Sequence, residues 1–287
     1  MATITASEVK TLRERTGAGM MECKAALVET DGNLDDAITL LRKRGLAQAA
    51  KRAGRATSEG SVGALLAPDG KRGALVEVNC ETDFVARTDD FQALVREAAE
   101  AVMAAGEAAS PEWLANPQGP VAQKVTAAIA KTGENMAAPR CAFFASDGFI
   151  TQDIHLGGKI GVMVDVRGPA AAVTSEAGRT LGKELAMHVA AASPQFVTRT
   201  QVSSDALERE RSIYRAQLEG QNKPANVIEK IVEGKLGSFY EQVVLLDQPS
   251  IRDPKVKVSQ VIADASKAAG GALEIARFVR LKLGESA

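Results

Sequence analysis

The chain has 287 residues, of which 45% are hydrophobic and 25% are charged, so it can bury a sizeable core. Its length suggests about two domains. The 35 lysine and arginine residues are balanced by 36 aspartate and glutamate residues. Such a balance lacks the positive field that drives nucleic-acid binding, and we expect no direct contact with nucleic acid.

The N-terminus, the lengths of the apolar stretches and the cysteine spacing further restrict the class of protein and its compartment. The sequence begins Met1-Ala2-Thr3-Ile4-Thr5, without a charged segment followed by an apolar run. No stretch approaches about 18 continuous apolar residues, the length typical of a membrane span. The three cysteines, Cys23, Cys80 and Cys141, are too far apart for a disulfide framework or a short-spaced metal site. We therefore expect a cytoplasmic protein that is neither secreted nor inserted in a membrane.

The N-terminal residues predict a bundle of three short helices. Thr5-Ala6-Ser7-Glu8 has the pattern of a capping box, which opens a helix with Val9 and Leu12 on its apolar side. Thr16-Gly17-Ala18-Gly19 ends this helix, and Gly45 is expected to close the third one in the left-handed conformation. The expected bounds of the second and third helices are Met20–Glu29 and Leu34–Arg44.

A β-hairpin is expected after the bundle. Residues 47–61 are mostly small or charged and indicate a linker. Val62–Leu66 and Gly73–Asn79 then have the pattern of strands on either side of Pro68-Asp69-Gly70, a turn sequence. These segments predict the first strands of an antiparallel sheet.

The end of the second strand carries the main candidate site. Alternation predicts that Val76 and Val78 point inward and Glu77 outward. The pattern breaks at Thr82-Asp83-Phe84-Val85, ahead of an amphipathic helix at Phe91–Met103. The apolar face of that helix comprises Phe91, Leu94, Val95, Ala98 and Val102. The residues alone leave two readings open: Phe84 lies in the core, as aromatic residues usually do, or it projects with Asp83 toward a partner.

A weak internal repeat favours the second reading. Lys71–Val78 resembles Lys159–Val166, and a helix follows each copy, the second at Ser175–Ala192. The chain therefore predicts two related α+β subdomains. The second copy continues into Arg167–Ala172, which we interpret as an ordinary loop. If both copies fold alike, the fold does not require Phe84.

The remaining elements are mostly helical. We expect Trp113 to be packed, and we expect a helical hairpin whose charged face is either solvated or used for self-association. The expected elements are helices at Val121–Thr132, Ala206–Leu218 (capped by Ser204-Asp205), Val227–Leu245 and Val258–Ala268, a turn at Gly220–Pro224, and a strand within Ala272–Leu283.

The sequence lacks the usual motifs of catalysis and cofactor binding. None of its four Gly-Lys pairs is followed by Ser or Thr, and Gly17-Ala18-Gly19 lacks the third glycine of a dinucleotide fingerprint. Only two histidines occur, so a histidine-rich metal site is excluded. We expect His188 to be packed in a helix and His155 to lie nearer the surface as an interface candidate. We expect no enzyme, no cofactor and no bound metal.

Several ordered segments carry a family resemblance. They are Leu12–Leu27 (LRERTGAGMMECKAAL), Glu77–Ala86 (EVNCETDFVA), Ala186–Ala191 (AMHVAA), Ile231–Lys235 (IVEGK) and Leu245–Pro249 (LLDQP). With these segments spread over nearly its whole length, the chain resembles the elongation factor Ts family, the bacterial guanine-nucleotide exchange factors for elongation factor Tu.

The resemblance implies an α+β fold with a defined division of the chain. It implies a ubiquitin-associated-like helical bundle at residues 1–55, a core N-subdomain at 56–140 and a core C-subdomain at 141–287. A protruding coiled-coil hairpin, inserted at roughly residues 200–246, would serve homodimerisation. Family members commonly continue into a further C-terminal helical module, whereas this sequence ends at Leu283–Ala287, so no contact of that module is carried over.

The resemblance also implies a function and site residues. The chain would bind elongation factor Tu and promote release of GDP and its exchange for GTP by disturbing the Mg²⁺ and phosphate site. The segment that intrudes near the Mg²⁺ site would be Thr82, Asp83, Phe84 and Val85. Further contacts with the GTPase would come from Leu12, Met20, Met21 and His155.

Overall fold

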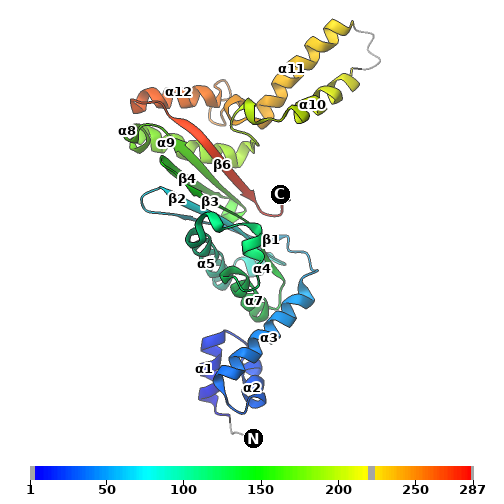
Figure 1. The fold of residues 1–287 in the computed structure, drawn as a ribbon, viewed down its shortest axis with the longest axis vertical. Helices are drawn as coiled ribbons and strands as arrows, with labels where there is room; N and C mark the ends of the chain where they lie inside the picture. The colour runs from blue at the N-terminus through cyan, green and yellow to red at the C-terminus, as the bar shows by residue number, and fades with distance from the viewer. Residues whose placement is uncertain (1–3, 219–223, 286–287) are drawn as a thin grey trace.

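The computed structural model describes residues 4–218 and 224–285, which form an N-terminal bundle, two sheet-and-helix units and a projecting pair of helices (Figure 1). The bundle comprises α1 (Ala6–Thr16), α2 (Met20–Glu29) and α3 (Leu34–Arg52). The predicted capping box is confirmed at Thr5 and Glu8, and Gly17 ends α1 in the left-handed conformation. The buried core of the bundle consists of Val9, Leu12, Cys23, Ala26, Leu27 and Ala37.

The predicted end of the third helix is wrong, because α3 continues through Gly45 to Arg52. Gly45 is buried where α3 crosses α7 (Pro120–Thr132). A Cβ at this glycine would lie 3.6 Å from the Cβ of Ala130. A glycine at a helix crossing and a glycine at a helix end look alike in sequence. The linker is correspondingly shorter than predicted and spans residues 53–58.

The first unit contains the predicted hairpin as part of a three-stranded antiparallel sheet in the order β1-β2-β3. Its elements are β1 (Glu59–Leu66), β2 (Arg72–Cys80), α4 (Asp83–Ala86), α5 (Asp89–Ala105), the 3-10 helix η1 (Gly106–Ala108), α6 (Pro111–Ala115), α7 and β3 (Met136–Ala145). The predicted apolar face of α5 is buried in full, and Trp113 packs against the same core. β3, which was not predicted, crosses residue 140, where the core N-subdomain was expected to end.

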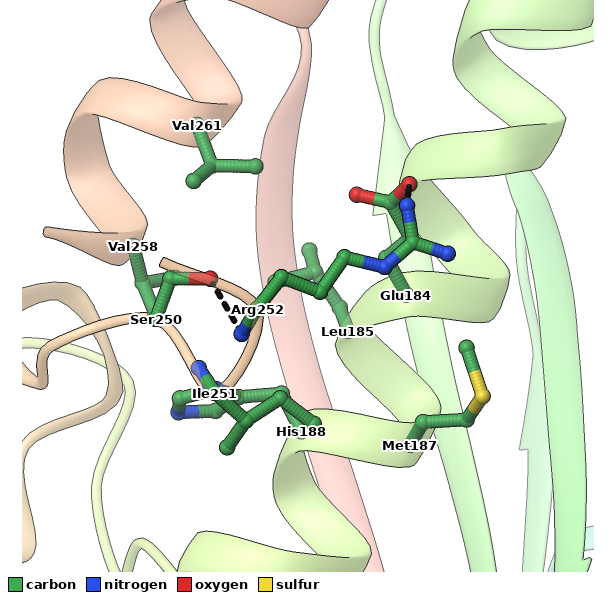
Figure 2. Close-up of a pocket in the computed structure, with 9 residues that line it drawn as sticks. All are labelled: Glu184, Leu185, Met187, His188, Ser250, Ile251, Arg252, Val258 and Val261. Carbon is green, nitrogen blue, oxygen red and sulfur yellow. Dashed lines mark hydrogen bonds and ion pairs between the residues drawn. The ribbon is translucent and has the colours of Figure 1, made fainter. Parts of the chain in front are cut away.

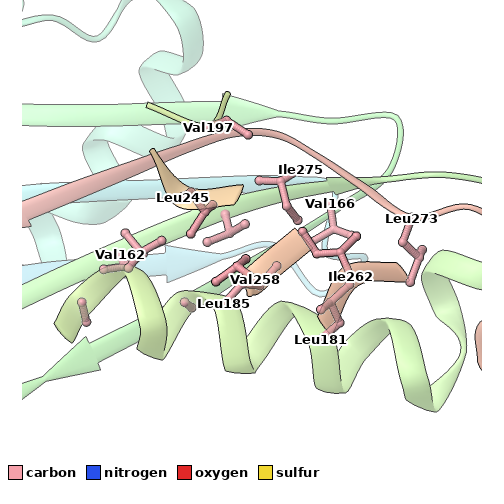
Figure 3. Close-up of a cluster of buried hydrophobic side chains, with 14 of the residues drawn as sticks. Val162, Val166, Leu181, Leu185, Val197, Leu245, Val258, Ile262, Leu273 and Ile275 are labelled. Carbon is pink, nitrogen blue, oxygen red and sulfur yellow. The ribbon is translucent and has the colours of Figure 1, made fainter. Parts of the chain in front are cut away.

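The second unit repeats this layout with an antiparallel sheet in the order β4-β5-β6. Its elements are β4 (Phe149–His155), η2 (Leu156–Gly158), β5 (Ile160–Arg167), α8 (Ala170–Thr174), α9 (Glu176–Ala192), η3 (Arg199–Gln201), η4 (Leu245–Asp247), α12 (Val258–Ala269) and β6 (Glu274–Lys282), with a helical pair inserted before η4. Figure 3 shows Val162 and Val166 of β5, Leu181 and Leu185 of α9, and Ile262 of α12 in one buried cluster.

The segment after β5 differs from the prediction of an ordinary loop. Pro169 precedes the short helix α8, in which Ala172 and Val173 are buried. The three alanines at positions 170–172 resemble a loop in sequence only because they follow Gly168 and Pro169. Both units therefore place a short helix between the central strand and the long helix.

The two sheets pack face to face, with α5 against the first sheet and α9 against the second. The cluster between the sheets consists of Val62, Leu75, Phe144, Ile150, Met163 and Leu281. β2 is consequently buried on both faces, and the prediction that Glu77 points outward is wrong, since its exposed fraction is 1%. Its carboxylate accepts a hydrogen bond from Nε of Arg140 at 2.7 Å. The alternation rule misled because it assumes that one face of a sheet meets water.

The helical pair α10 (Ser204–Ala216) and α11 (Ala225–Val243) projects from the second unit (Figure 1). Arg215 of α10 joins Glu229 of α11 through an ion pair of 2.9 Å. The helix cap is Ser203, one residue before the predicted one. Most of the predicted turn at 220–224 lies outside the described residues. Among residues 4–218 and 224–285, no helix is long and apolar enough to cross a membrane.

Candidate functional site

The short helix α4 presents the Thr82–Val85 segment at the end of β2. Thr82 is the N-cap, and its Oγ1 accepts a hydrogen bond from the backbone N–H of Val85 at 3.3 Å. Val85 is half-buried against the core of the first unit, and Ala86 is buried there. Phe84 occupies the opposite side of the turn and is 80% exposed. The reading of Phe84 as a core residue is therefore excluded.

A set of hydrogen bonds, which we call the brace, holds this helix in place. The backbone N–H and Oγ1 of Thr82 both donate to the carboxylate of Glu134, at 3.1 Å and 2.6 Å. The carboxylate of Glu81 accepts from the backbone N–H of Asn135 at 2.6 Å and from Arg55 at 3.3 Å. The bond from Asn135, aided by Arg55, lowers the pKa of Glu81. The brace fixes the backbone that carries Phe84, which reduces the entropy lost when a partner binds.

Asp83 forms an ion pair of 2.8 Å with Arg87, four residues later in the same turn. The side chains of Asp83 and Arg87 are 43% and 79% exposed. Exposed pairs of this kind contribute at most about 1 kcal/mol, so a partner group can replace Arg87 at little cost. Asp83 and Phe84, which we call the acid–aromatic pair, are therefore both accessible to a partner at the surface.

Cys80 lies directly behind this segment and is buried. Its Sγ donates to the carbonyl of Thr82 at 3.2 Å. Burial and the negative charge of Glu134 raise the pKa of Cys80 to about 12. A thiol that stays protonated at neutral pH is a poor nucleophile, and Cys80 supports the turn rather than reacting.

The other sequence-predicted contacts lie in two further places. Leu12 is fully buried in the bundle core, which leaves none of its surface for a partner. Met20 and Met21, at the start of α2, are 49% and 73% exposed. The bundle stands apart from the sheets (Figure 1), so these methionines and Phe84 form separate exposed patches. His155, at the end of β4, is exposed as predicted, with 51% of its side-chain surface accessible.

A small pocket next to α9 contains the second histidine (Figure 2). His188 is buried, as predicted; its Nε2 lies 2.9 Å from Oε1 of Gln248, and its Nδ1 accepts from the backbone N–H of Ile251. Nε2 therefore carries the proton. Burial lowers the pKa of His188 and keeps the ring neutral. The cavity measures about 20 Å³, room for about one water molecule, and the ion pair of Glu184 with Arg252 lies at its edge.

Sequence reasoning missed Glu134 and Asn135, which complete the brace. They lie more than fifty residues beyond Thr82 and Glu81, as the separations of 52 and 54 residues record. No local pattern connects positions so far apart. The only sequence signal was the pair of polar residues directly before an unpredicted strand.

The described residues form an α+β protein whose candidate site is a braced, exposed acid–aromatic turn. Within them, no group of three His, Cys, Asp or Glu residues is arranged to hold a metal ion.

Comparison with known proteins identifies the family. The family profile described as Elongation factor TS matches residues 81–285. The chain is 45% identical to "Elongation factor Ts" of Trichlorobacter lovleyi, over 98% of the chain and 93% of that relative. It is 46% identical to the protein of the same name from Rhodospirillum rubrum, over 99% and 94% of the two chains. The chain therefore belongs to the elongation factor Ts family of translation elongation factors.

Proposed function

We propose that this chain binds elongation factor Tu in its GDP form and promotes release of GDP and its exchange for GTP. The observation that carries the proposal is the 80% exposure of Phe84 on a turn held by the brace. The chain acts through protein binding in the cytoplasm, without a cofactor of its own and without direct contact with nucleic acid.

In this mechanism the residues of the acid–aromatic turn have different roles. Phe84 inserts between packed elements of the GTPase near its Mg²⁺ site, with Thr82 and Val85 at the rim of that contact. Asp83 exchanges Arg87 for groups of the GTPase and disturbs the charges and hydrogen bonds that hold Mg²⁺ and the phosphate loop. The nucleotide then leaves.

The differential binding energy needed for exchange exceeds what burial of a single side chain can supply. By linkage, a factor that weakens nucleotide binding is itself weakened equally by nucleotide. A 10⁴-fold effect needs roughly 5.5 kcal/mol of differential binding energy, whereas burying one Phe supplies about 1.5–3 kcal/mol. We therefore propose an interface of about 1,600 Å² or more, assembled from the bundle with Met20 and Met21, and from both units, including His155. The pair α10–α11 remains our candidate for homodimerisation.

Release of fluorescent GDP from elongation factor Tu tests the proposal. Phe84→Ala should slow catalysed release roughly 10- to 100-fold, since it removes about 1.5–3 kcal/mol of apolar contact. Its melting temperature should stay at the wild-type value because Phe84 is exposed. Ile251→Ala, which trims a 45% exposed side chain in the second unit, is the matched control and should leave release unchanged.

Two outcomes would contradict the mechanism. Wild-type release rates with a folded Phe84→Ala variant would exclude the wedge. Binding of the wild-type chain to elongation factor Tu without any acceleration of GDP release would make it an adaptor rather than an exchange factor.

A further inference from the structure

Leu156 combines a strained backbone with an exposed apolar side chain, and neither feature stabilises the fold. Its backbone has φ of 52°, in the left-handed region that non-glycine residues rarely adopt. Leucine has no polar side chain that would ease this conformation, so the position costs folding stability. Its side chain is nevertheless 64% exposed and gains little from packing within the chain. Backbone strain of this kind persists mainly where function requires it.

The turn that carries Leu156 is firmly attached to the rest of the protein. Gly158 packs so closely on β1 that a Cβ there would lie 2.2 Å from Oγ of Ser61. Lys159 forms an ion pair of 3.6 Å with Glu59, and its carbonyl accepts from the backbone N–H of Leu283 at 2.9 Å. Leu156 therefore projects from a fixed support, as Phe84 does.

The two projections lie at the same end of β1. Glu59, which pairs with Lys159, is the first residue of β1 and lies opposite Cys80 in the β1–β2 register. The turn α4 begins three residues after Cys80 and contacts β1, and η2 contacts the same strand from the side of the second sheet. Ile154, two residues before Leu156 in the sequence, is also exposed, at 43%.

We propose that Leu156 is a second apolar anchor for the GTPase that Phe84 engages, and that it supplies affinity rather than the release step. This inference rests on the proposed function. The occupant is an apolar patch of that same GTPase, because the turns that carry Leu156 and Phe84 both contact β1 near its first residues. When the GTPase binds, burial of the Leu156 side chain offsets the free-energy cost of its strained backbone.

Three substitutions at this position separate contact from folding. Leu156→Gly removes the side chain and relieves the backbone, Leu156→Ala removes the side chain but keeps the strain, and Leu156→Met keeps apolar volume. Calorimetric titration with elongation factor Tu bound to GDP should give a Kd about tenfold higher for the Gly and Ala variants and a wild-type Kd for Met. Only Leu156→Gly should melt at a higher temperature than wild type. GDP release at saturating concentrations of each variant should stay at the wild-type rate.

The outcomes distinguish this inference from the function on which it rests. A wild-type Kd for Leu156→Gly, with slow release by Phe84→Ala, would overturn the anchor and leave the exchange function intact. Normal release by Phe84→Ala would instead count against the proposed mechanism. A lower melting temperature for Leu156→Gly would assign Leu156 to folding. A change in self-association with an unchanged Kd would assign this surface to a second copy of the chain. Both of these last results also overturn the anchor.

Discussion

The two sheet-and-helix units share a frame but differ at one turn. In both, a buried carboxylate on the central strand, Glu77 or Asp165, pairs with the arginine opposite it on the third strand, Arg140 or Arg277. Each arginine also donates to a backbone carbonyl of the other sheet: Arg140 to Lys282 at 2.6 Å and Arg277 to Ala145 at 2.7 Å. The two pairs thus join the sheets in a reciprocal way.

The difference lies in the short helix after each central strand. α8 begins Ala170-Ala171 and packs against the second unit through the buried residues Ala172 and Val173. α4 begins Asp83-Phe84, buries only Ala86 and is held by the brace. The frame itself therefore does not require an exposed aromatic residue. The comparison separates residues that build the frame from residues that act on a partner, and each of the following variants tests that separation.

The largest effect is expected for the frame carboxylate Glu77. Glu77→Ala leaves Arg140, whose side chain is only 15% exposed, without its anion. Removing one partner of a buried pair costs about 3–5 kcal/mol, and urea unfolding should report a loss of this size. Asp165→Ala should cost less, about 1–3 kcal/mol, because Arg167 and Arg277 are each 43% exposed and can be solvated. Equal losses in the two variants would contradict this account.

Local signals explain which parts of the frame were predictable. The capping box at Thr5 and the turn at Pro68-Asp69-Gly70 act over a few residues, and both predictions were confirmed. β3 was missed because it is an edge strand with alanines, Pro139 and Arg140, residues with little strand preference. The burial of Glu77 depends on a second sheet that no local pattern reveals. The exposure of Phe84 was predictable through the repeat and the family resemblance, whereas the brace was not predictable.

The brace should affect function more than stability. Glu134→Ala removes the acceptor for both donors of Thr82, and we expect a loss of about 1–3 kcal/mol in unfolding free energy. Because the turn that carries Phe84 then becomes mobile, GDP release should slow although Phe84 is still present. Glu97→Ala is the control, since its partner Lys124 is exposed and the pair contributes under about 1 kcal/mol. Normal release by a folded Glu134→Ala variant would remove the brace from the mechanism.

A smaller, stabilising effect is expected at Gly45. A Cβ there meets Ala130 and Thr126 at ordinary contact distances of 3.6 and 3.8 Å, so alanine fits. Gly45→Ala should raise the unfolding free energy by about 0.5–1 kcal/mol through helix propensity. Gly234→Ala in α11, where a Cβ would meet nothing within 4 Å, is the matched control and should gain a similar amount. A loss of stability in Gly45→Ala alone would mean that the α3–α7 crossing is tighter than its geometry indicates.

The smallest effect is a pH dependence of stability that arises from the buried His188. Burial lowers the pKa of His188 below its ordinary value of 6.5, so the unfolded chain binds a proton that the folded chain excludes. Stability should therefore fall as the pH drops below about 6.5 and should stop falling at the lower folded pKa. Urea midpoints at pH 7.5 and 5.5 measure this slope. His188→Gln should reduce it, because the buried imidazole is then absent. An unchanged slope in His188→Gln would show that burial of the imidazole does not couple folding to protons in this pH range.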